Sequence, residues 1–232
     1  MWEMVSPPTQ FISSNPLNET TERHGDFSHL TVVLLLAAGL SVRMGQSKML
    51  LPWSSGTLLD ALVMRVLQET PHPLVVVCRP DLPLAIHNSR LHFVLNNSPE
   101  RGISHSIQLA VSFMQAKWPG ASAAILLGDE PFVLGTDIRR VIGDFDRRSA
   151  NCHVVRPRYN QIPGHPVIFD CEALRWTGQL RGDRGFGALW AQHASAVCYV
   201  DYGVSGRPNP AKDIDTPEDY RTACRLAAEM ER

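Results

Sequence analysis

Two basic residues set in a stretch of small residues could bind the phosphates of a nucleotide. The stretch covers residues 37–48 and reads Ala-Ala-Gly-Leu-Ser-Val-Arg-Met-Gly-Gln-Ser-Lys. Small residues allow backbone N–H groups to approach an anion closely. Arg43 offers several planar donors to phosphate oxygens, whereas Lys48 offers a compact positive charge. The pattern predicts a triphosphate-binding loop, although its glycines fit neither the Walker A nor the Rossmann spacing. The alternative is a glycine-containing turn with two solvated basic residues.

Carboxylates in two other segments could hold a divalent cation against such phosphates. Asp129 directly follows an apolar run and Gly128, while Asp213 and Asp215 lie in the string Asp-Ile-Asp-Thr-Pro-Glu-Asp at residues 213–219. Magnesium prefers oxygen ligands and needs few of them from the protein. Structural alternatives exist, because Gly-Asp is a common turn pair and Thr-Pro-Glu-Asp is typical of a helix N-terminus. The second alternative leaves Asp213 and Asp215 without a role.

The elements that must position these loops alternate between strands and helices. Short apolar runs predict buried strands at residues 32–36, 74–78, 91–95 and 121–127, with weaker strands at 152–155, 166–169 and 196–200. Apolar residues at helical spacing predict helices at residues 58–68, 103–118, 136–145 and 217–230. This alternation predicts a doubly wound, mostly parallel sheet in a three-layer α/β/α fold. Ligands bind beyond the carboxyl ends of strands in such sheets, where both loops fall.

The composition is typical of one globular domain. With 232 residues, 44% of them hydrophobic, the chain can bury one substantial core. We therefore expect a flexible N-terminal extension over residues 1–30 and one domain over residues 31–232. A net charge of -1, from 22 basic and 23 acidic residues, provides no global field for nucleic acid.

The cysteine and hydropathy patterns favour the cytoplasm. The five cysteines are odd in number and widely spaced, which favours a reducing compartment. The first thirty residues do not resemble a secretory signal, and the longest apolar run, residues 32–38, is too short to span a bilayer. We expect a cytoplasmic protein without membrane or nucleic-acid partners. The sequence also has no zinc-type Cys or His cluster and no serine-hydrolase elbow.

The predicted phosphate loop resembles the signature of the molybdenum cofactor nucleotidyltransferases. Residues 36–48 match Leu-Ala-Ala-Gly-x-Ser-x-Arg-Met-Gly-x-x-Lys, and residues 50–52 match the Leu-Leu-Pro that follows it. The resemblance implies a Rossmann-like fold of the nucleotidyltransferase (nucleotide-diphospho-sugar transferase) type, whose loop wraps an NTP. It implies nucleotide contacts for Ala37, Ala38, Gly39, Ser41, Arg43, Gly45 and Lys48. The Ala-Ala-Gly string is similar to the CTP-using branch, whereas the GTP-using branch usually has Ala-Gly-Gly.

Two further motifs of the resemblance concern the metal. Residues 128–132, Gly-Asp-Glu-Pro-Phe, are similar to a Gly-Asp-Gln-Pro-Phe motif whose Asp binds the cation. Glu130 departs from that Gln and would add a negative charge beside the metal, which would either strengthen metal binding or weaken affinity for the triphosphate. The string at residues 213–219 resembles a carboxyl-terminal family motif. The resemblance thus implies Mg²⁺ bound by Asp129 and Asp213, with Asp215 as the substitute for Asp213.

Three more motifs imply contacts with the nucleotide and the acceptor. The Gly-x-Ser-x-Ser motif places Gly102, Ser104 and Ser106 near the base or ribose, although Ser104 could simply cap a helix. A Gly-His-Pro motif and a Gly-Asp-x-Gly motif place His165, Asp183 and Arg184 on the acceptor side. Alternatively, His165 is a structural residue, and Asp183 and Arg184 pair with each other or cap the following helix.

The resemblance implies transfer of CMP from CTP to molybdopterin, with release of pyrophosphate. Arg43, Lys48 and Asp129 would be the catalytic residues, and the product would supply a molybdenum hydroxylase apoenzyme through a transient contact. The alternatives are transfer of GMP from GTP to molybdopterin and nucleotidyl transfer to a sugar or polyol phosphate. A non-enzymatic cofactor carrier or chaperone is a further alternative, but a carrier needs no paired metal carboxylates.

Overall fold

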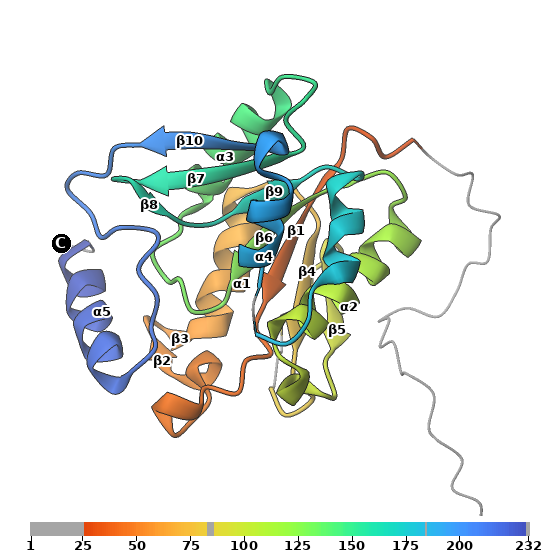
Figure 1. Ribbon diagram of the computed structural model, residues 1–232. Helices are drawn as coiled ribbons and strands as arrows, with labels where there is room; N and C mark the ends of the chain where they lie inside the picture. Colours follow the sequence, from red (N-terminus) through yellow and green to blue (C-terminus); the bar gives the residue numbers. More distant parts are fainter. Residues whose placement is uncertain (1–25, 83–85, 184, 231–232) are drawn as a thin grey trace, which may run out of the picture.

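The computed structural model describes residues 26–82, 86–183 and 185–230 (Figure 1). Of the extension expected at residues 1–30, only residues 26–30 lie within this part. Phe27 and Leu30 pack against a buried hydrophobic cluster. The backbone carbonyl of Leu30 accepts a hydrogen bond from the Ser122 N–H at 2.9 Å. The described end of the extension is therefore attached to the domain.

A mostly parallel sheet with strand order β10-β7-β9-β6-β1-β4-β5 forms the centre of the fold, with β8 beside β7. Its strands are β1 (Thr31–Leu36), β4 (Leu74–Cys78), β5 (Leu91–Leu95), β6 (Ser122–Leu127), β7 (Val154–Tyr159), β8 (Ile162–Pro163), β9 (Val167–Phe169) and β10 (Val197–Tyr202). Strands β4, β1 and β6 are parallel neighbours, whereas β9 runs antiparallel to both β6 and β7. A small separate hairpin joins β2 (Pro52–Trp53) to β3 (Gly56–Thr57).

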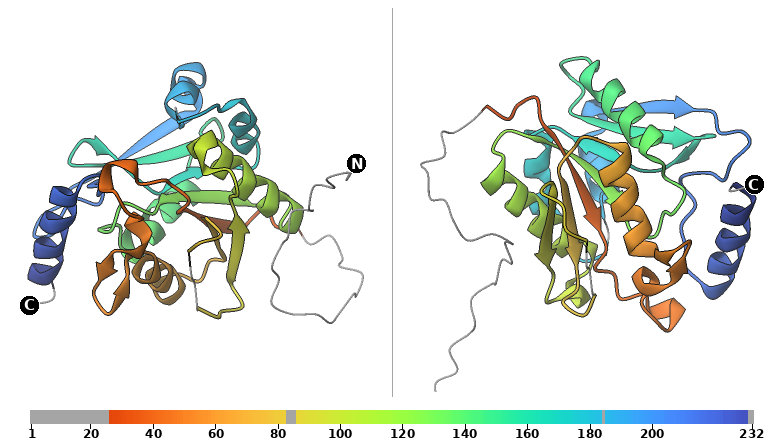
Figure 2. Two further views of the ribbon diagram at one scale, coloured as in Figure 1. Left: turned by 90° about the horizontal axis from the view of Figure 1, so that it is seen from below. Right: turned by 180° about the vertical axis from the view of Figure 1, so that it is seen from behind.

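Helices cover both faces of the sheet. Helices α2 (Ile103–Lys117) and α4 (Gly187–Gln192) lie on the face that Figure 1 shows, and α1 (Leu58–Glu69) and α3 (Gly135–Asp146) lie on the opposite face, seen from behind in Figure 2. Helix α5 (Pro217–Met230) closes the chain beside the hairpin. Short 3-10 helices are η1 (Val42–Met44), η2 (Lys48–Leu50), η3 (Pro99–Arg101), η4 (Ala173–Gln179) and η5 (Ala194–Ala196).

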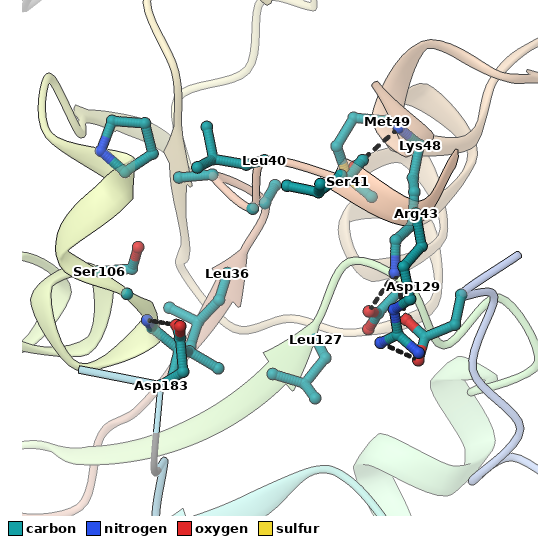
Figure 3. Close-up of a pocket in the computed structure, with 18 of the residues that line it drawn as sticks. Leu36, Leu40, Ser41, Arg43, Lys48, Met49, Ser106, Leu127, Asp129 and Asp183 are labelled. Carbon is teal, nitrogen blue, oxygen red and sulfur yellow. Dashed lines mark hydrogen bonds and ion pairs between the residues drawn. The ribbon is translucent and has the colours of Figure 1, made fainter. Parts of the chain in front are cut away.

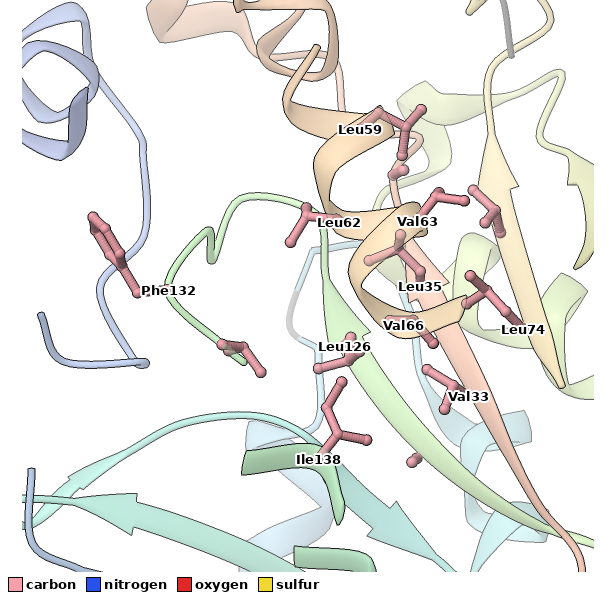
Figure 4. Packing of buried hydrophobic residues seen from close by; sticks show 14 of the residues in the cluster. Val33, Leu35, Leu59, Leu62, Val63, Val66, Leu74, Leu126, Phe132 and Ile138 are labelled. Atoms are coloured by element: carbon pink, nitrogen blue, oxygen red, sulfur yellow. The ribbon is translucent and has the colours of Figure 1, made fainter. Parts of the chain in front are cut away.

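Alternation along the strands explains the two hydrophobic layers. Successive side chains of a strand point to opposite faces of its sheet. Val33 and Leu35 of β1 therefore pack under α1, as Figure 4 shows, whereas Val32 and Leu34 join the cluster beneath α2. All of these β1 side chains are fully buried. The continuous apolar run is thus explained by cover on both faces, and the predicted three-layer architecture is confirmed.

All of the predicted strands and helices are present, with bounds that shift by a few residues. The features that were not predicted include the antiparallel direction of β9, the β2–β3 hairpin, strand β8, the 3-10 helices and a disulfide. The disulfide joins Cys152, just before β7, to Cys198 in β10, against the expectation drawn from cysteine spacing. Within the described ranges, none of the helices is both long enough and apolar enough to cross a membrane.

Candidate active site

A pocket of about 580 Å³ opens at the carboxyl edge of the sheet (Figure 3). Its walls come from the loop after β1, the start of η2, η3 and the start of α2, the loop after β6, Asp183 and the segment before α5. The carboxyl ends of β1 and β6 lie side by side because these strands are parallel neighbours. This pairing brings the predicted phosphate loop and the Asp129 loop together.

One end of the pocket holds a network of opposite charges. The Lys48 ammonium lies 3.1 Å from an Asp129 carboxylate oxygen and 2.7 Å from an Asp215 oxygen. Arg43 donates to the other Asp215 oxygen at 2.6 Å. Lys48 and Asp215 are 167 residues apart in the sequence. The structure therefore brings together charged residues that the sequence places in three separate segments.

The shifts in pKa show an excess of negative charge in this network. Burial disfavours the Lys48 ammonium, but Asp129 and Asp215 more than offset this effect, so the pKa of Lys48 is raised. The hydrogen bond from Lys48 is the largest cause that lowers the pKa of Asp215. Burial, followed by repulsion from Asp215 and Asp129, raises the pKa of Asp213. Asp213 is thus the carboxylate whose charge is least compensated.

The residues present fit a divalent cation that also binds substrate oxygens. Both carboxylate oxygens of Asp215 are engaged by Lys48 and Arg43, whereas no described side chain donates a hydrogen bond to the carboxylate of Asp213. Among the described residues, no group of three or more His, Cys, Asp or Glu side chains is arranged to hold a metal by itself. Magnesium commonly takes one or two carboxylates together with phosphates and water. Asp129 and Asp213 meet that requirement.

The loop after β1 is held in shape by its own side chains and backbone. Ser41 adopts a left-handed conformation with φ 54°, and its hydroxyl accepts a hydrogen bond from the Lys48 N–H at 3.1 Å. Gly45, with φ 70°, ends η1 and lies outside the pocket lining. The predicted nucleotide contacts that do line the pocket here are Ala37, Ala38, Gly39, Ser41, Arg43 and Lys48. Gly45 therefore serves the turn, where its left-handed conformation is easily adopted.

The loop that carries Asp129 is fixed by three neighbouring segments. The Asp129 carbonyl accepts a hydrogen bond from the Ile214 N–H at 2.9 Å. Arg65 of α1 donates to the carbonyls of Pro131 at 2.6 Å and Val133 at 3.0 Å. Arg207 donates to the Phe132 carbonyl at 3.3 Å. These bonds hold the carboxylate of Asp129 at the pocket edge.

The opposite end of the pocket is formed by the start of α2. Gly102 and Ser106 line it, as do Pro99, Glu100 and Ile103, which the sequence did not single out. Ser104 is buried outside the lining, and its N–H donates to the Gly182 carbonyl at 3.1 Å. Asp183 lines the pocket and caps α2, since it accepts a hydrogen bond from the Ile103 N–H at 3.2 Å. Arg184 lies outside the described residues.

Glu130 and His165 lie outside the pocket lining and contact each other, which agrees with the structural alternative for His165. Their side chains are 7% and 13% exposed, and His165 Nδ1 lies 2.8 Å from Glu130 Oε1. Neither residue is part of the pocket lining. In this structure the Glu130 carboxylate is not part of the pocket wall, and its partner is the His165 imidazole. No local pattern in the sequence indicated this pair, which is formed between the start of β9 and the loop after β6.

Comparisons with protein families, with known sequences and with solved structures each find proteins that are similar to this chain. Residues 33–197 match the family model described as MobA-like NTP transferase domain. The chain is 30% identical over 195 residues to the molybdenum cofactor cytidylyltransferase of Escherichia coli (strain K12), which covers 82% of this chain and 93% of that protein. The crystal structure of Rv0371c from Mycobacterium tuberculosis H37Rv is similar, with a TM-score of 0.70, 26% identity, and coverage of 84% of this chain and 98% of that one. A structure of Rv0371c in complex with manganese gives a TM-score of 0.68, 23% identity and the same coverages of 84% and 98%.

Proposed function

Because the chain belongs to the MobA-like NTP transferase family and is a nucleotidyltransferase, we propose that it transfers CMP from CTP to molybdopterin with release of pyrophosphate. Its fold is of the nucleotide-diphospho-sugar transferase type, as the sequence resemblance predicted. The observation that carries the proposal is the convergence of Arg43, Lys48 and Asp129 at one end of the pocket. The product would then be supplied to a molybdenum hydroxylase apoenzyme.

In the proposed reaction, a terminal phosphate oxygen of the acceptor attacks the α-phosphorus of CTP. A new P–O bond forms, and the bond to the leaving pyrophosphate breaks. Arg43 and Lys48 bind the β- and γ-phosphates and stabilise the charge that develops on pyrophosphate. Backbone N–H groups of the loop after β1 orient the same phosphates. Mg²⁺, bound by Asp129 and Asp213, would supply further charge neutralisation.

Two comparisons support the choice of nucleotide and metal. The E. coli relative is a cytidylyltransferase, and residues 37–39 carry the Ala-Ala-Gly string of the CTP-using branch. The manganese in the M. tuberculosis structure supports a divalent cation in this fold. Asp213 also supports it, because burial and the neighbouring carboxylates of Asp215 and Asp129 raise its pKa more than Lys48 lowers it.

A pyrophosphate assay tests the proposal. The protein is incubated with Mg²⁺, molybdopterin and each of the four NTPs, and pyrophosphate release is measured. We expect release with CTP that depends on molybdopterin. Release with GTP alone would establish guanylyl transfer instead, whereas release from CTP with a sugar or polyol phosphate but not with molybdopterin would replace the acceptor. No release with any NTP would favour a carrier of the finished cofactor.

A further inference from the structure

The side chain of Asn96 has a fixed orientation behind Ser106, one of the residues that line the pocket. Asn96 follows β5 and is 0% exposed. Its Oδ1 accepts a hydrogen bond from the Ser98 N–H at 2.9 Å. Since only the oxygen of an amide side chain can accept, this bond excludes the flipped amide. The Asn96 NH₂ group must therefore point away from the Ser98 N–H.

That orientation makes Ser106 an acceptor of the Asn96 hydrogen bond. Asn96 Nδ2 donates to the Ser106 hydroxyl oxygen at 2.9 Å. An NH₂ group cannot accept a hydrogen bond, so the Ser106 hydroxyl hydrogen points elsewhere. A serine in a helix often donates to the carbonyl four residues earlier. Within the described part of the chain, the Ser106 hydroxyl makes no such bond and no hydrogen bond other than the one from Asn96.

The free hydrogen is available to a ligand at the α2 end of the pocket. Ser106 lines the pocket together with the apolar residues Leu36, Pro99 and Ile103 and with Glu100 and Asp183. In Figure 3, Ser106 lies across the pocket from Arg43 and Lys48. The charged end suits the phosphates, so the end near Ser106 suits a nucleobase.

We infer that Asn96 is a positioning residue that makes Ser106 a hydrogen-bond donor to the nucleobase. The group recognised is a carbonyl oxygen or an unprotonated ring nitrogen, such as those on the pairing edge of cytosine. This inference rests on the proposed function, since it requires an NTP in the pocket. Asn96, which lies outside the pocket lining, would thereby determine whether Ser106 donates or accepts the hydrogen bond with the base.

The variant Asn96→Asp reverses that polarity with little change in shape. One carboxylate oxygen can still accept from the Ser98 N–H, and the other replaces the NH₂ group. The Ser106 hydroxyl must then donate its hydrogen to the introduced carboxylate, so the lone pairs of the Ser106 oxygen point toward the base. We expect the calorimetric Kd for CTP, measured with Mg²⁺ and without acceptor, to rise about tenfold. Ser106→Ala should give a similar loss, and the double variant should be no worse than Ser106→Ala alone.

Two further measurements keep the test decisive. Asn160 is the matched control, because its exposed amide bonds both the N–H and the carbonyl of Val204, and Asn160→Asp should leave CTP binding unchanged. If Asn96→Asp does not fold, Ser106→Ala is compared with wild type for CTP and for ribose 5-triphosphate, which lacks a base. A loss confined to CTP supports the inference.

Three results would overturn it. They are wild-type affinity of folded Asn96→Asp for CTP, an equal loss for ribose 5-triphosphate in Ser106→Ala, and unchanged CTP binding in Ser106→Ala. Each leaves the proposed function intact, because wild type would still bind CTP and release pyrophosphate. Failure of wild type to bind CTP would instead overturn the proposed function, and this inference with it.

Discussion

The His165 imidazole lies 2.8 Å from the Glu130 carboxylate, and both side chains are largely buried. The second carboxylate oxygen of Glu130 is buried without a hydrogen-bond partner in the described structure. We predict that Glu130→Ala lowers the free energy of unfolding by about 2 kcal/mol, because it leaves His165 buried without its partner. Glu130→Gln should cost less, since its amide can still bond to the imidazole. Urea denaturation measures both losses.

Glu172 provides the control for this prediction. It also lies near a histidine, with 3.9 Å between Glu172 Oε2 and His153 Nδ1, but its side chain is 67% exposed. Glu172→Ala should therefore change the unfolding free energy by about 0.5 kcal/mol or less. Equal losses for Glu130→Ala and Glu172→Ala would show that the buried pair contributes no more to stability than the exposed pair does.

Lys48 should matter far more for rate than for folding. Its ammonium bonds Asp129 and Asp215 in the free protein and is positioned to bind phosphates during the proposed reaction. We predict that Lys48→Met lowers kcat for pyrophosphate release by about 100-fold or more. Lys117→Met, at an exposed position of α2, is the control and should keep the wild-type rate. A Lys48→Met protein that is folded and fully active would contradict this role.

Replacing each of the two aspartates before α5 by asparagine should change the thermal unfolding temperature in opposite directions. Burial, Asp215 and Asp129 raise the pKa of Asp213, so its charge opposes folding at neutral pH, and without metal Asp213→Asn should raise the thermal unfolding temperature. The pKa of Asp215 is lowered chiefly by Lys48, so Asp215→Asn should lower that temperature.

EDTA should abolish activity. If Asp213 binds the cation, Asp213→Asn should raise the Mg²⁺ concentration for half-maximal rate about tenfold or more. A larger rise with Asp215→Asn would reverse the assignment.

The sequence predicted those parts of the fold that depend on local pattern. The runs that form β4 and β5 were predicted with the observed bounds, because β4 is a fully buried strand that is apolar along its whole length, and β5 is apolar except for His92. The direction of a strand within its sheet, by contrast, does not change its pattern of residue types. Val167 to Phe169 would read alike in a parallel and an antiparallel strand, so the reversal of β9 was not predictable.

The same limit applies to the pocket. The loop from Ala37 to Lys48 could be recognised because its residues are contiguous and chemically specific. The bond from Asn96 to Ser106, and that between Glu130 and His165, depend on how side chains are oriented after folding. Neither orientation follows from residue type or spacing.

Low pH should reduce the free energy of unfolding, partly through protonation of His92. This residue lies in β5, and its ring centroid is 5.8 Å from that of Phe113 and 5.2 Å from that of Trp118. Burial, followed by repulsion from Lys117, lowers its pKa below 6.5. Below that pH, the unfolded chain binds the proton more tightly than the folded chain does, so stability falls as pH falls. His92→Gln should reduce the drop in unfolding free energy between about pH 7.5 and about pH 5.5. The exposed His87→Gln should not, and equal slopes for both variants would contradict this origin.

Gly102 should tolerate no side chain, for two separable reasons. Its φ of +82° disfavours any other residue, and a Cβ there would lie 2.5 Å from Asp183 Oδ1 and 2.5 Å from the Gly182 carbonyl carbon. Gly120 has a similar φ of +87° but open space around it. Gly120→Ala therefore measures backbone strain alone, about 1–2 kcal/mol of unfolding free energy, and should leave CTP binding unchanged. Gly102→Ala should cost more and should also weaken CTP binding, because relieving the clash moves the start of α2 at the pocket wall. Equal effects of the two variants on stability and on CTP affinity would show that contact with the Gly182–Asp183 segment has no part in shaping the pocket.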